Sequence, residues 1–338
     1  MQRLDLAAEI LEFFDLYDSG IGDRLLVARS LTEWADLVHE YFAGTHVCFK
    51  SSGSLGESSV HEHALQVLRA EAEAHAEYLK AERVIMLAPL HHIYGFIWGV
   101  LLPEILAVPV LEGTPAVRAV HRDLQAGDLI VAPPLWWKHL AQAVKRFPAD
   151  VCGITSTAPL PTPVWDDLLT SGLHTLHEIY GASELAGIGC RQHWTKRFEL
   201  LAPWQGLTAC GQRLVDRAGR ISAELPDHLD FAAPRSFSII KRKDRKVQVA
   251  GYNVSPLDIA ARLKTHTLVL DCQVRLMRPD EGDRLKAQVV TRHETSPEQR
   301  AEFRRWCHQN LLAHERPSLT FTTKASVNEM GKFSDWHI

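Results

Sequence analysis

Apolar side chains recur along the chain in two spacings, one typical of helices and one typical of buried strands. Residues 4–42 and 60–81 have apolar positions three and four residues apart, which predicts amphipathic helices. Short apolar runs predict strands at 47–49, 84–87, 129–132, 151–155 and 175–179, and the segments between the later runs predict helices at 135–147 and 164–171. This alternation is typical of an α/β fold with layered sheets and helices and mostly parallel strands.

The longest apolar run spans residues 93–111 and is interrupted by Pro103, Glu104 and Pro109. Because a helix that crosses a bilayer rarely tolerates such residues, the run predicts a buried helix followed by a buried strand. Residues 1–20 also lack the basic segment and apolar core of a signal peptide. We therefore expect a cytoplasmic protein with no membrane span.

The pattern changes after residue 205. Segments 220–224 and 236–241 predict antiparallel strands, and the polar run 241–246 predicts a hinge. Beyond the hinge, the sequence predicts helices near 256–264 and 297–313 and strands near 268–277, 284–292 and 319–323. We expect residues 1–242 to form a large N-terminal domain and residues 243–338 to form a small, mobile α+β domain.

Composition narrows the classes of function. The chain has 338 residues, 46% hydrophobic and 23% charged, with a formal net charge of -4, which is ordinary for a globular protein. This charge argues against general nucleic-acid binding. The six cysteines form no CxxC pair, so neither a zinc ribbon nor a disulfide framework is predicted.

The segment Tyr180-Gly181-Ala182-Ser183-Glu184 combines several kinds of binding chemistry directly after a predicted strand. The tyrosine ring can stack on a base, and the serine hydroxyl can donate to a phosphate. The glutamate is a hard oxygen ligand of the kind that binds Mg²⁺ together with substrate phosphates. A plain β-turn in which Ser183 caps a helix is the structural alternative.

Three other loops also follow predicted strands. The Ser/Gly loop 51–56 can surround phosphate oxygens with hydroxyls and amides, but it lacks the ending of a Walker loop. The small residues of loop 155–160 allow a flat ring to approach the backbone. His92 and Tyr94 follow the strand at 84–87, where α/β folds bind ligands, and with Trp136 and Trp137 they could form an aromatic pocket or belong to the core.

Three charged residues complete the set of candidates. A carboxylate such as Asp227 can accept both hydroxyls of a ribose, and Arg242 can support the same sugar or a phosphate. Asp230 competes with Asp227 for this role. Near the C-terminus, Lys332 can bring a concentrated positive charge to a carboxylate that attacks phosphorus. Taken singly, each of these residues is better explained as a solvated surface charge.

These segments, in this order, resemble the adenylate-forming superfamily of acyl-CoA and aryl-CoA synthetases, peptide-synthetase adenylation domains and luciferases. The resemblance covers roughly residues 47–335, and its most specific stretch is KRKDRKVQVAGYNVSPLD at 241–258. It implies an AMP-forming acid–thiol ligase that uses ATP and Mg²⁺. Such enzymes first make an acyl-adenylate and then transfer the acyl group to a thiol after the small domain rotates.

The resemblance also implies a role for each matching residue. The phosphate loop would be Ser51, Ser52, Gly53, Ser54 and Gly56. The adenine would lie beside Thr157, Ala158 and Pro159, with Tyr180 stacked on it, and Gly181 would also belong to the nucleotide-binding residues. The α-phosphate would contact Ser183, the Mg²⁺ ion Glu184, and the ribose Asp227 and Arg242. Lys332 would promote adenylation, Lys243 or Asp244 would be the pivot, Gly251 would line the thiol channel, and His92 would separate the acid from the nucleotide.

The chain departs from this pattern in the phosphate loop, where Glu57-Ser58-Ser59 replaces the usual Pro-Lys, and at Gln248, where a lysine is common. In its compact size, the chain resembles the hydroxybenzoate ligases encoded in xanthomonadin and aryl polyene pigment clusters. We therefore expect an aromatic carboxylic acid as substrate and an acyl carrier protein as acceptor. A CoA acceptor and a non-catalytic nucleotide-binding homologue are the alternatives. A shortened N-terminal domain would expose a surface that a second subunit could cover, which is consistent with a homodimer.

Overall fold

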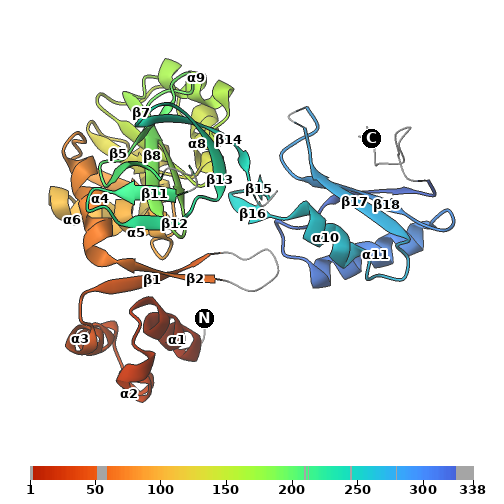
Figure 1. Ribbon diagram of the computed structural model, residues 1–338, viewed down its shortest axis with the longest axis horizontal. Helices are drawn as coiled ribbons and strands as arrows, with labels where there is room; N and C mark the ends of the chain where they lie inside the picture. The colour runs from red at the N-terminus through yellow and green to blue at the C-terminus, as the bar shows by residue number, and fades with distance from the viewer. Residues whose placement is uncertain are drawn as a thin grey trace. The chain divides into compact units, whose positions relative to one another are not determined.

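The computed structural model describes residues 3–51, 59–208, 211, 213–243, 246–278 and 280–324. These residues form two compact units, one that ends at residue 240 and one that begins at residue 241 (Figure 1). Each unit has a hydrophobic core of its own, because the apolar clusters of the first contain no residue of the second. The two units are described separately below.

A nine-stranded mixed sheet organises the first unit, in the order β13-β14-β9-β8-β7-β6-β5-β3-β4. Strands β3 to β7 are parallel to one another, and the direction reverses at β8, which pairs antiparallel with β7 and β9. The strands are β3 Arg83–Met86, β4 Val110–Leu111, β5 Asp128–Val131, β6 Cys152–Thr155, β7 Thr175–Ala182, β8 Ala186–Arg191, β9 Phe198–Leu200, β13 Asp227–Ala233 and β14 Ser236–Arg242. The predicted α/β class is confirmed, although half of the sheet is antiparallel.

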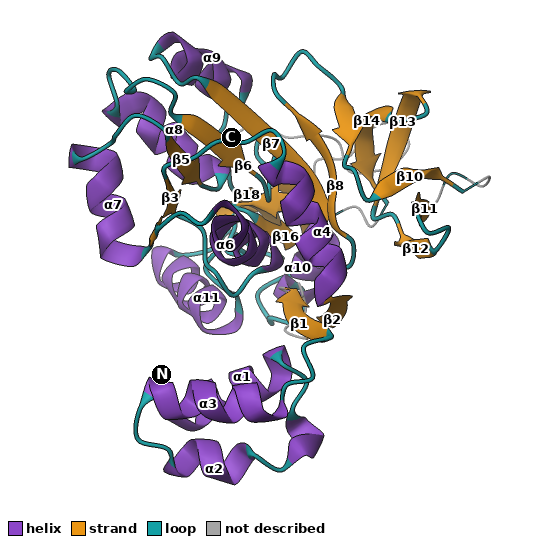
Figure 2. Cartoon of the chain, turned by 90° about the vertical axis from the view of Figure 1, so that its left-hand side faces the viewer, coloured by secondary structure: helices purple, strands orange, loops and turns teal. Residues whose placement is uncertain are grey.

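Helices cover both faces of the parallel half of this sheet (Figure 2). They are α4 Leu65–Ala76, α5 Ile93–Phe96, the π-helical turn η2 Ile97–Leu101, α6 Leu102–Leu106, α7 Gly113–Arg122, α8 Pro134–Ala143 and α9 Thr162–Thr170. Alternate residues of β5 belong to different cores: Leu129 and Val131 pack with Trp98 and Leu102, and Ile130 packs on the other face. Both faces are therefore buried, as in other parallel sheets.

The two cores meet at the backbone of β6. The Tyr94 hydroxyl donates to the Ile154 carbonyl at 3.1 Å, and the Trp137 indole nitrogen donates to the same oxygen at 3.0 Å. Tyr94 belongs to one core and Trp137, which is fully buried, to the other. The alternative in which Tyr94 and Trp137 are core residues is therefore correct.

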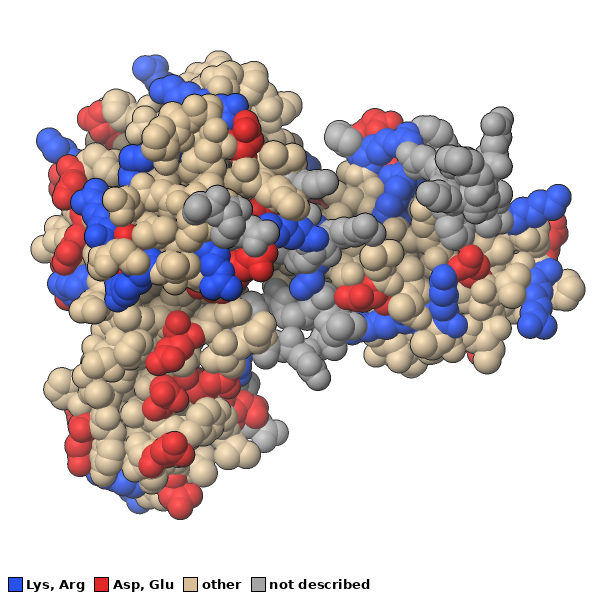
Figure 3. Space-filling view, viewed as in Figure 1, with Lys and Arg blue, Asp and Glu red and all other residues tan. Residues whose placement is uncertain are grey.

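The N-terminal segment folds as helices around a small core of their own. These are α1 Arg3–Phe13, the 3₁₀ turn η1 Tyr17–Ser19, α2 Gly22–Val27 and α3 Leu31–Tyr41, which are followed by the hairpin β1 His46–Ser51 and β2 Ser59–Ala64. The helix predicted from residue 60 begins five residues later, because residues 59–64 pair with β1. Acidic side chains gather over these helices in Figure 3.

A smaller sheet of the first unit consists of β10 Trp204–Leu207, β11 Arg213–Asp216 and β12 Ile221–Glu224.

The second unit has a three-stranded sheet with two helices against its apolar face. Its elements are β15 Val247–Val249, β16 Tyr252–Val254, α10 Pro256–Leu263, β17 Asp271–Leu276, β18 Leu285–Val290, α11 Pro297–Asn310 and β19 Ser318–Thr322. Pro256 occupies the first turn of α10 as predicted, and the preceding Ser255 caps that helix by accepting from Asp258 N at 3.2 Å. None of the helices formed by the described residues has the length and apolar character needed to cross a bilayer.

The turn between β15 and β16 offers a test of this unit. Val249 pairs with Tyr252, so Ala250 and Gly251 form a two-residue loop, with φ values of 51° and 86°. Such loops favour Asn-Gly, because a non-glycine residue such as alanine is strained at positive φ. We expect Ala250→Asn to raise the unfolding free energy of this unit by about 1 kcal/mol, measured by chemical denaturation. Gly251→Ala should lower the unfolding free energy, because it places a side chain at positive φ. Equal effects of the two substitutions would contradict the assignment of a two-residue loop at positive φ.

Candidate functional site

The segment Tyr180–Glu184 lies at the end of β7 and in the turn that leads into β8. Residues 183–185 form the turn, closed by a hydrogen bond of 3.0 Å from Leu185 N to Ala182 O. A β-bulge between Tyr180 and Gly181 interrupts the pairing of the two strands. The side chains of Ser183 and Glu184 are half-buried. The helix-capping alternative for Ser183 is thus wrong, since a strand follows the turn.

Gly181 is required by the close approach of the two strands. A Cβ atom at this position would lie 2.5 Å from the Ala186 carbonyl oxygen, which belongs to the backbone and cannot move independently. Ala186 itself has a φ of 59°, so the hairpin combines a tight contact with a strained residue. The glycine of the sequence motif therefore has a steric role in bringing β8 against β7.

Tyr180 connects the hairpin to β13. Its hydroxyl donates to Asp227 Oδ2 at 2.7 Å, and its ring packs against Phe198 and Phe237 with centroid distances of 5.9 and 5.7 Å. Asp227 is only 5% exposed. Asp230 is exposed and instead pairs with Arg197 at 3.0 Å. Of the two competing aspartates, Asp227 is therefore the one beside the tyrosine.

The loop that carries Thr157, Ala158 and Pro159 is fastened to β7 on both sides. Ser156 Oγ donates to Ile179 O at 2.9 Å, and Leu160 N donates to the buried carboxylate of Glu178 at 2.8 Å. These bonds hold the loop beside the strand that leads to Tyr180. Thr157 is exposed and has a φ of 77°, a conformation that is strained for a β-branched residue.

His92 lies at the N-terminus of α5, but its side chain makes no capping hydrogen bond. It is exposed, and its ring centroid lies 4.4 Å from that of His91. Desolvation by surrounding atoms, followed by the neighbouring His91, lowers the pKa of His92. A neutral imidazole is therefore available at the end of the segment that follows β3.

The remaining predicted residues are described only in part. Gly251 lies at the tip of the β15–β16 hairpin in the second unit, next to Tyr252, whose ring stacks on His314 at 4.0 Å. The backbone of Ser51 ends β1, that of Arg242 ends β14, and Lys243 follows it. Outside the described residues lie Ser52, Gly53, Ser54, Gly56, Asp244 and Lys332.

The donor set fits Mg²⁺ only if substrate supplies most of the ligands. Among the described residues, no three His, Cys, Asp or Glu side chains converge as a metal site. Glu184 alone provides a half-buried carboxylate on the hairpin. Because Mg²⁺ commonly binds one or two carboxylates with waters and phosphate oxygens, Glu184 suits an ion that arrives with a polyphosphate.

Two residues near the site were missed in the sequence. Glu178 holds loop 155–160 and is paired with Arg191 at 2.6 Å, and His63 of β2 contacts the Ser183 carbonyl. For Glu178 a signal existed, because a carboxylate within the buried run 175–179 requires a partner. His63 gave no such signal, since it lies in a stretch rich in helix-forming residues.

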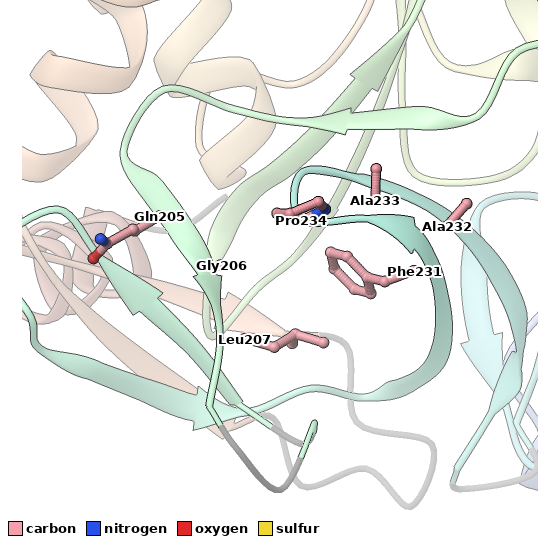
Figure 4. A pocket seen from close by; sticks show the side chains of 7 residues that line it. All are labelled: Gln205, Gly206, Leu207, Phe231, Ala232, Ala233 and Pro234. Carbon is pink, nitrogen blue, oxygen red and sulfur yellow. The ribbon is translucent and has the colours of Figure 1, made fainter.

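One hollow of the first unit lies away from these residues. It has a volume of about 430 Å³ and lies between β10 and the turn after β13, where the Phe231 ring lies between Leu207 and Pro234 (Figure 4). None of the described candidate residues lines it. The hollow is therefore separate from the candidate site.

Known proteins resemble the chain over nearly its whole length. A protein of Halorhodospira halophila named 4-coumarate–CoA ligase is 38% identical over 338 residues, covering 98% of this chain and 86% of that protein. Another of this name from Cereibacter sphaeroides is 33% identical over 345 residues, covering 98% and 82%. The solved structure of an o-succinylbenzoate CoA synthetase double mutant from Bacillus subtilis shares the fold, with a TM-score of 0.66 at 15% identity over 85% of this chain and 67% of that chain. No family model matches.

The Tyr180–Asp227 hydrogen bond should contribute measurably to stability. Tyr180→Phe removes a donor from a buried carboxylate, which should lower the unfolding free energy by about 1–3 kcal/mol. Chemical denaturation measures this change. Tyr17→Phe is the matched control, because the Tyr17 hydroxyl is part of an exposed side chain and its loss should cost less than about 0.5 kcal/mol. Equal losses in the two variants would contradict the importance of the pair.

The steric role of Gly181 can be tested in the same way. Gly181→Ala forces a methyl group against the Ala186 backbone and should destabilise the protein by about 1–3 kcal/mol, seen as a lower midpoint of thermal unfolding. Gly206→Ala is the control, because a Cβ atom there would meet its nearest atom at 3.9 Å. If Gly181→Ala unfolds at the temperature of the control, the hairpin tolerates a side chain and the argument fails.

Proposed function

The chain belongs to the family of adenylate-forming enzymes represented by the proteins named 4-coumarate–CoA ligase, and we propose that it activates a hydroxylated aromatic acid with ATP and transfers the acyl group to CoA. It is an AMP-forming acid–thiol ligase. One observation supports the nucleotide site of this proposal: the hairpin with Ser183 and Glu184, the tyrosine bonded to Asp227, and loop 155–160 are held together around β7.

In the proposed complex, the adenine lies between Tyr180 and the backbone of residues 157–159. Asp227 accepts from the ribose hydroxyls, with Arg242 beside it. The Ser183 hydroxyl donates to the α-phosphate. Glu184 would hold Mg²⁺, which supplies charge neutralisation to the phosphates when bound. These roles are supported by the hydrogen bond between Tyr180 and Asp227 and by the hydrogen bond that holds loop 155–160 beside β7.

The proposed chemistry proceeds in two steps. An oxygen of the substrate carboxylate attacks the α-phosphorus, and the bond to pyrophosphate breaks. We assign to Lys332 the positive charge that stabilises this transition state, and to His92 a place between the acid and the nucleotide. The thiol then attacks the acyl carbon of the adenylate and AMP leaves. Lys243 or Asp244 would be the pivot of the small domain, and Gly251 would line the path of the thiol.

CoA is proposed as the acceptor because the relatives are named as CoA ligases. The carrier protein suggested by the compact sequence stays a prediction, as does its hydroxybenzoate substrate. The relatives' names refer to 4-coumarate, so both sources agree on an aromatic acid with a ring hydroxyl. Retention of Glu184 and Lys332 in the chain argues against a non-catalytic homologue, which has no need of both groups.

Pyrophosphate exchange tests the first step. Purified protein should exchange labelled pyrophosphate into ATP when given 4-coumarate or 3- or 4-hydroxybenzoate. Lys332→Ala should lower this exchange by at least about 10²-fold, because a charge beside the transferring phosphorus is lost. Lys324→Ala, another lysine of the same unit, is the control and should retain activity. Absence of exchange with every aromatic acid would refute the proposed function.

Parallel reactions with CoA and with a phosphopantetheinylated carrier protein test the second step. We expect an aryl-CoA product, detected by mass spectrometry, and little acylation of the carrier protein. Preferential acylation of the carrier protein would instead establish the acceptor predicted from the sequence. Thioester formation with neither acceptor, despite pyrophosphate exchange, would contradict both assignments.

A further inference from the structure

Side chains outside the hairpin that carries Ser183 and Glu184 hydrogen-bond to its backbone, His63 within the turn and Glu71 two residues after it. Trp204 Nε1 also donates to the Gly187 carbonyl at 2.7 Å. Within the turn, His63 Nε2 lies 2.7 Å from the Ser183 carbonyl oxygen. A carbonyl can only accept, so Nε2 carries the proton and donates it. Burial lowers the pKa of His63, and the ring of this half-buried residue is therefore neutral near pH 7. His63 is part of β2, so the contact links two hairpins through residues that lie 120 positions apart.

After the turn, the hairpin is held by Glu71 of α4. Its Oε2 accepts from Gly187 N at 3.0 Å, and the side chain is almost completely buried. A Cβ atom at Gly187 would overlap the Glu71 carboxylate, so this glycine makes the room for the contact. On the other side, Glu71 Oε1 lies 3.7 Å from Nε2 of the buried His75. A buried carboxylate is unfavourable unless it is paired. The Glu71 carboxylate is paired with the backbone amide of Gly187 in the candidate site and with His75.

We propose that His63 and Glu71 are positioning residues for acid activation, which fix the Ser183–Glu184 turn by holding its backbone at Ser183 and, just after it, at Gly187. The inference rests on the proposed function of that turn. His63 lies on β2 and Glu71 on α4, outside the loops that would contact the nucleotide. Both contact the backbone of the hairpin, so we expect them to act through it. Because small displacements of reacting groups cost large factors in rate, loosening either contact should slow the ATP-dependent step.

The test compares the two half-reactions. His63→Leu and Glu71→Leu remove the donor and the acceptor, and each should lower pyrophosphate exchange about tenfold. Transfer to CoA from a supplied acyl-adenylate needs no ATP and should change by less than about threefold. This second activity also reports that the variants are folded. His63→Gln and Glu71→Gln keep a donor or acceptor and should recover most of the exchange.

Glu73→Gln is the matched control on the same helix, because Glu73 is exposed and forms an ion pair with the exposed Arg69 at 3.3 Å. It should exchange pyrophosphate at the unaltered rate. Equal losses in both half-reactions, or no loss in the leucine variants, would overturn the inference while leaving the proposed function intact. Absence of exchange by the unaltered protein would overturn both.

Discussion

The reversal of strand direction between β7 and β8 is the constraint on which the rest of the site depends. Parallel strands bring the loops after their carboxyl ends to one edge of a sheet, and ligands commonly bind there. Because β8 turns back antiparallel at that edge, the Tyr180–Glu184 segment stays on the sheet and is not carried away by a crossover helix. Gly181 makes the reversal sterically possible.

Buried carboxylates fasten this edge of the sheet. Glu178 accepts from Leu160 N, Glu71 from Gly187 N, and Asp227 from the Tyr180 hydroxyl. An isolated buried carboxylate is unfavourable, but one that accepts a well-formed hydrogen bond from a neighbouring segment specifies how the two segments pack. The same three contacts bring together a loop, a hairpin and an edge strand. The candidate site is thus built on rigid elements, which favours fixed geometry.

Some elements were predictable because their signal is local. The apolar runs at 84–87 and 129–132 match β3 and β5 within one residue at each end, since a strand buried on both faces is continuously apolar. Strand β8 escaped prediction because its sequence AGIGCR contains two glycines, which are poor strand formers. Tertiary contacts explain them: a Cβ at Gly189 would lie 2.5 Å from Phe237, and one at Gly187 would meet Glu71. Helix α7 escaped because its buried face consists mostly of alanine.

The sequence by itself determined the class of fold, the order of the chemistry-bearing segments and the types of group available for binding a nucleotide, since these depend on local pattern and residue type. Only the tertiary structure decided that Asp227, rather than Asp230, lies beside Tyr180, and that Tyr94 and Trp137 belong to the core. It also decided that His63 and Glu71 hold the hairpin from 120 and 116 positions away. Contacts over such separations depend on strand pairing and packing, which no local spacing encodes.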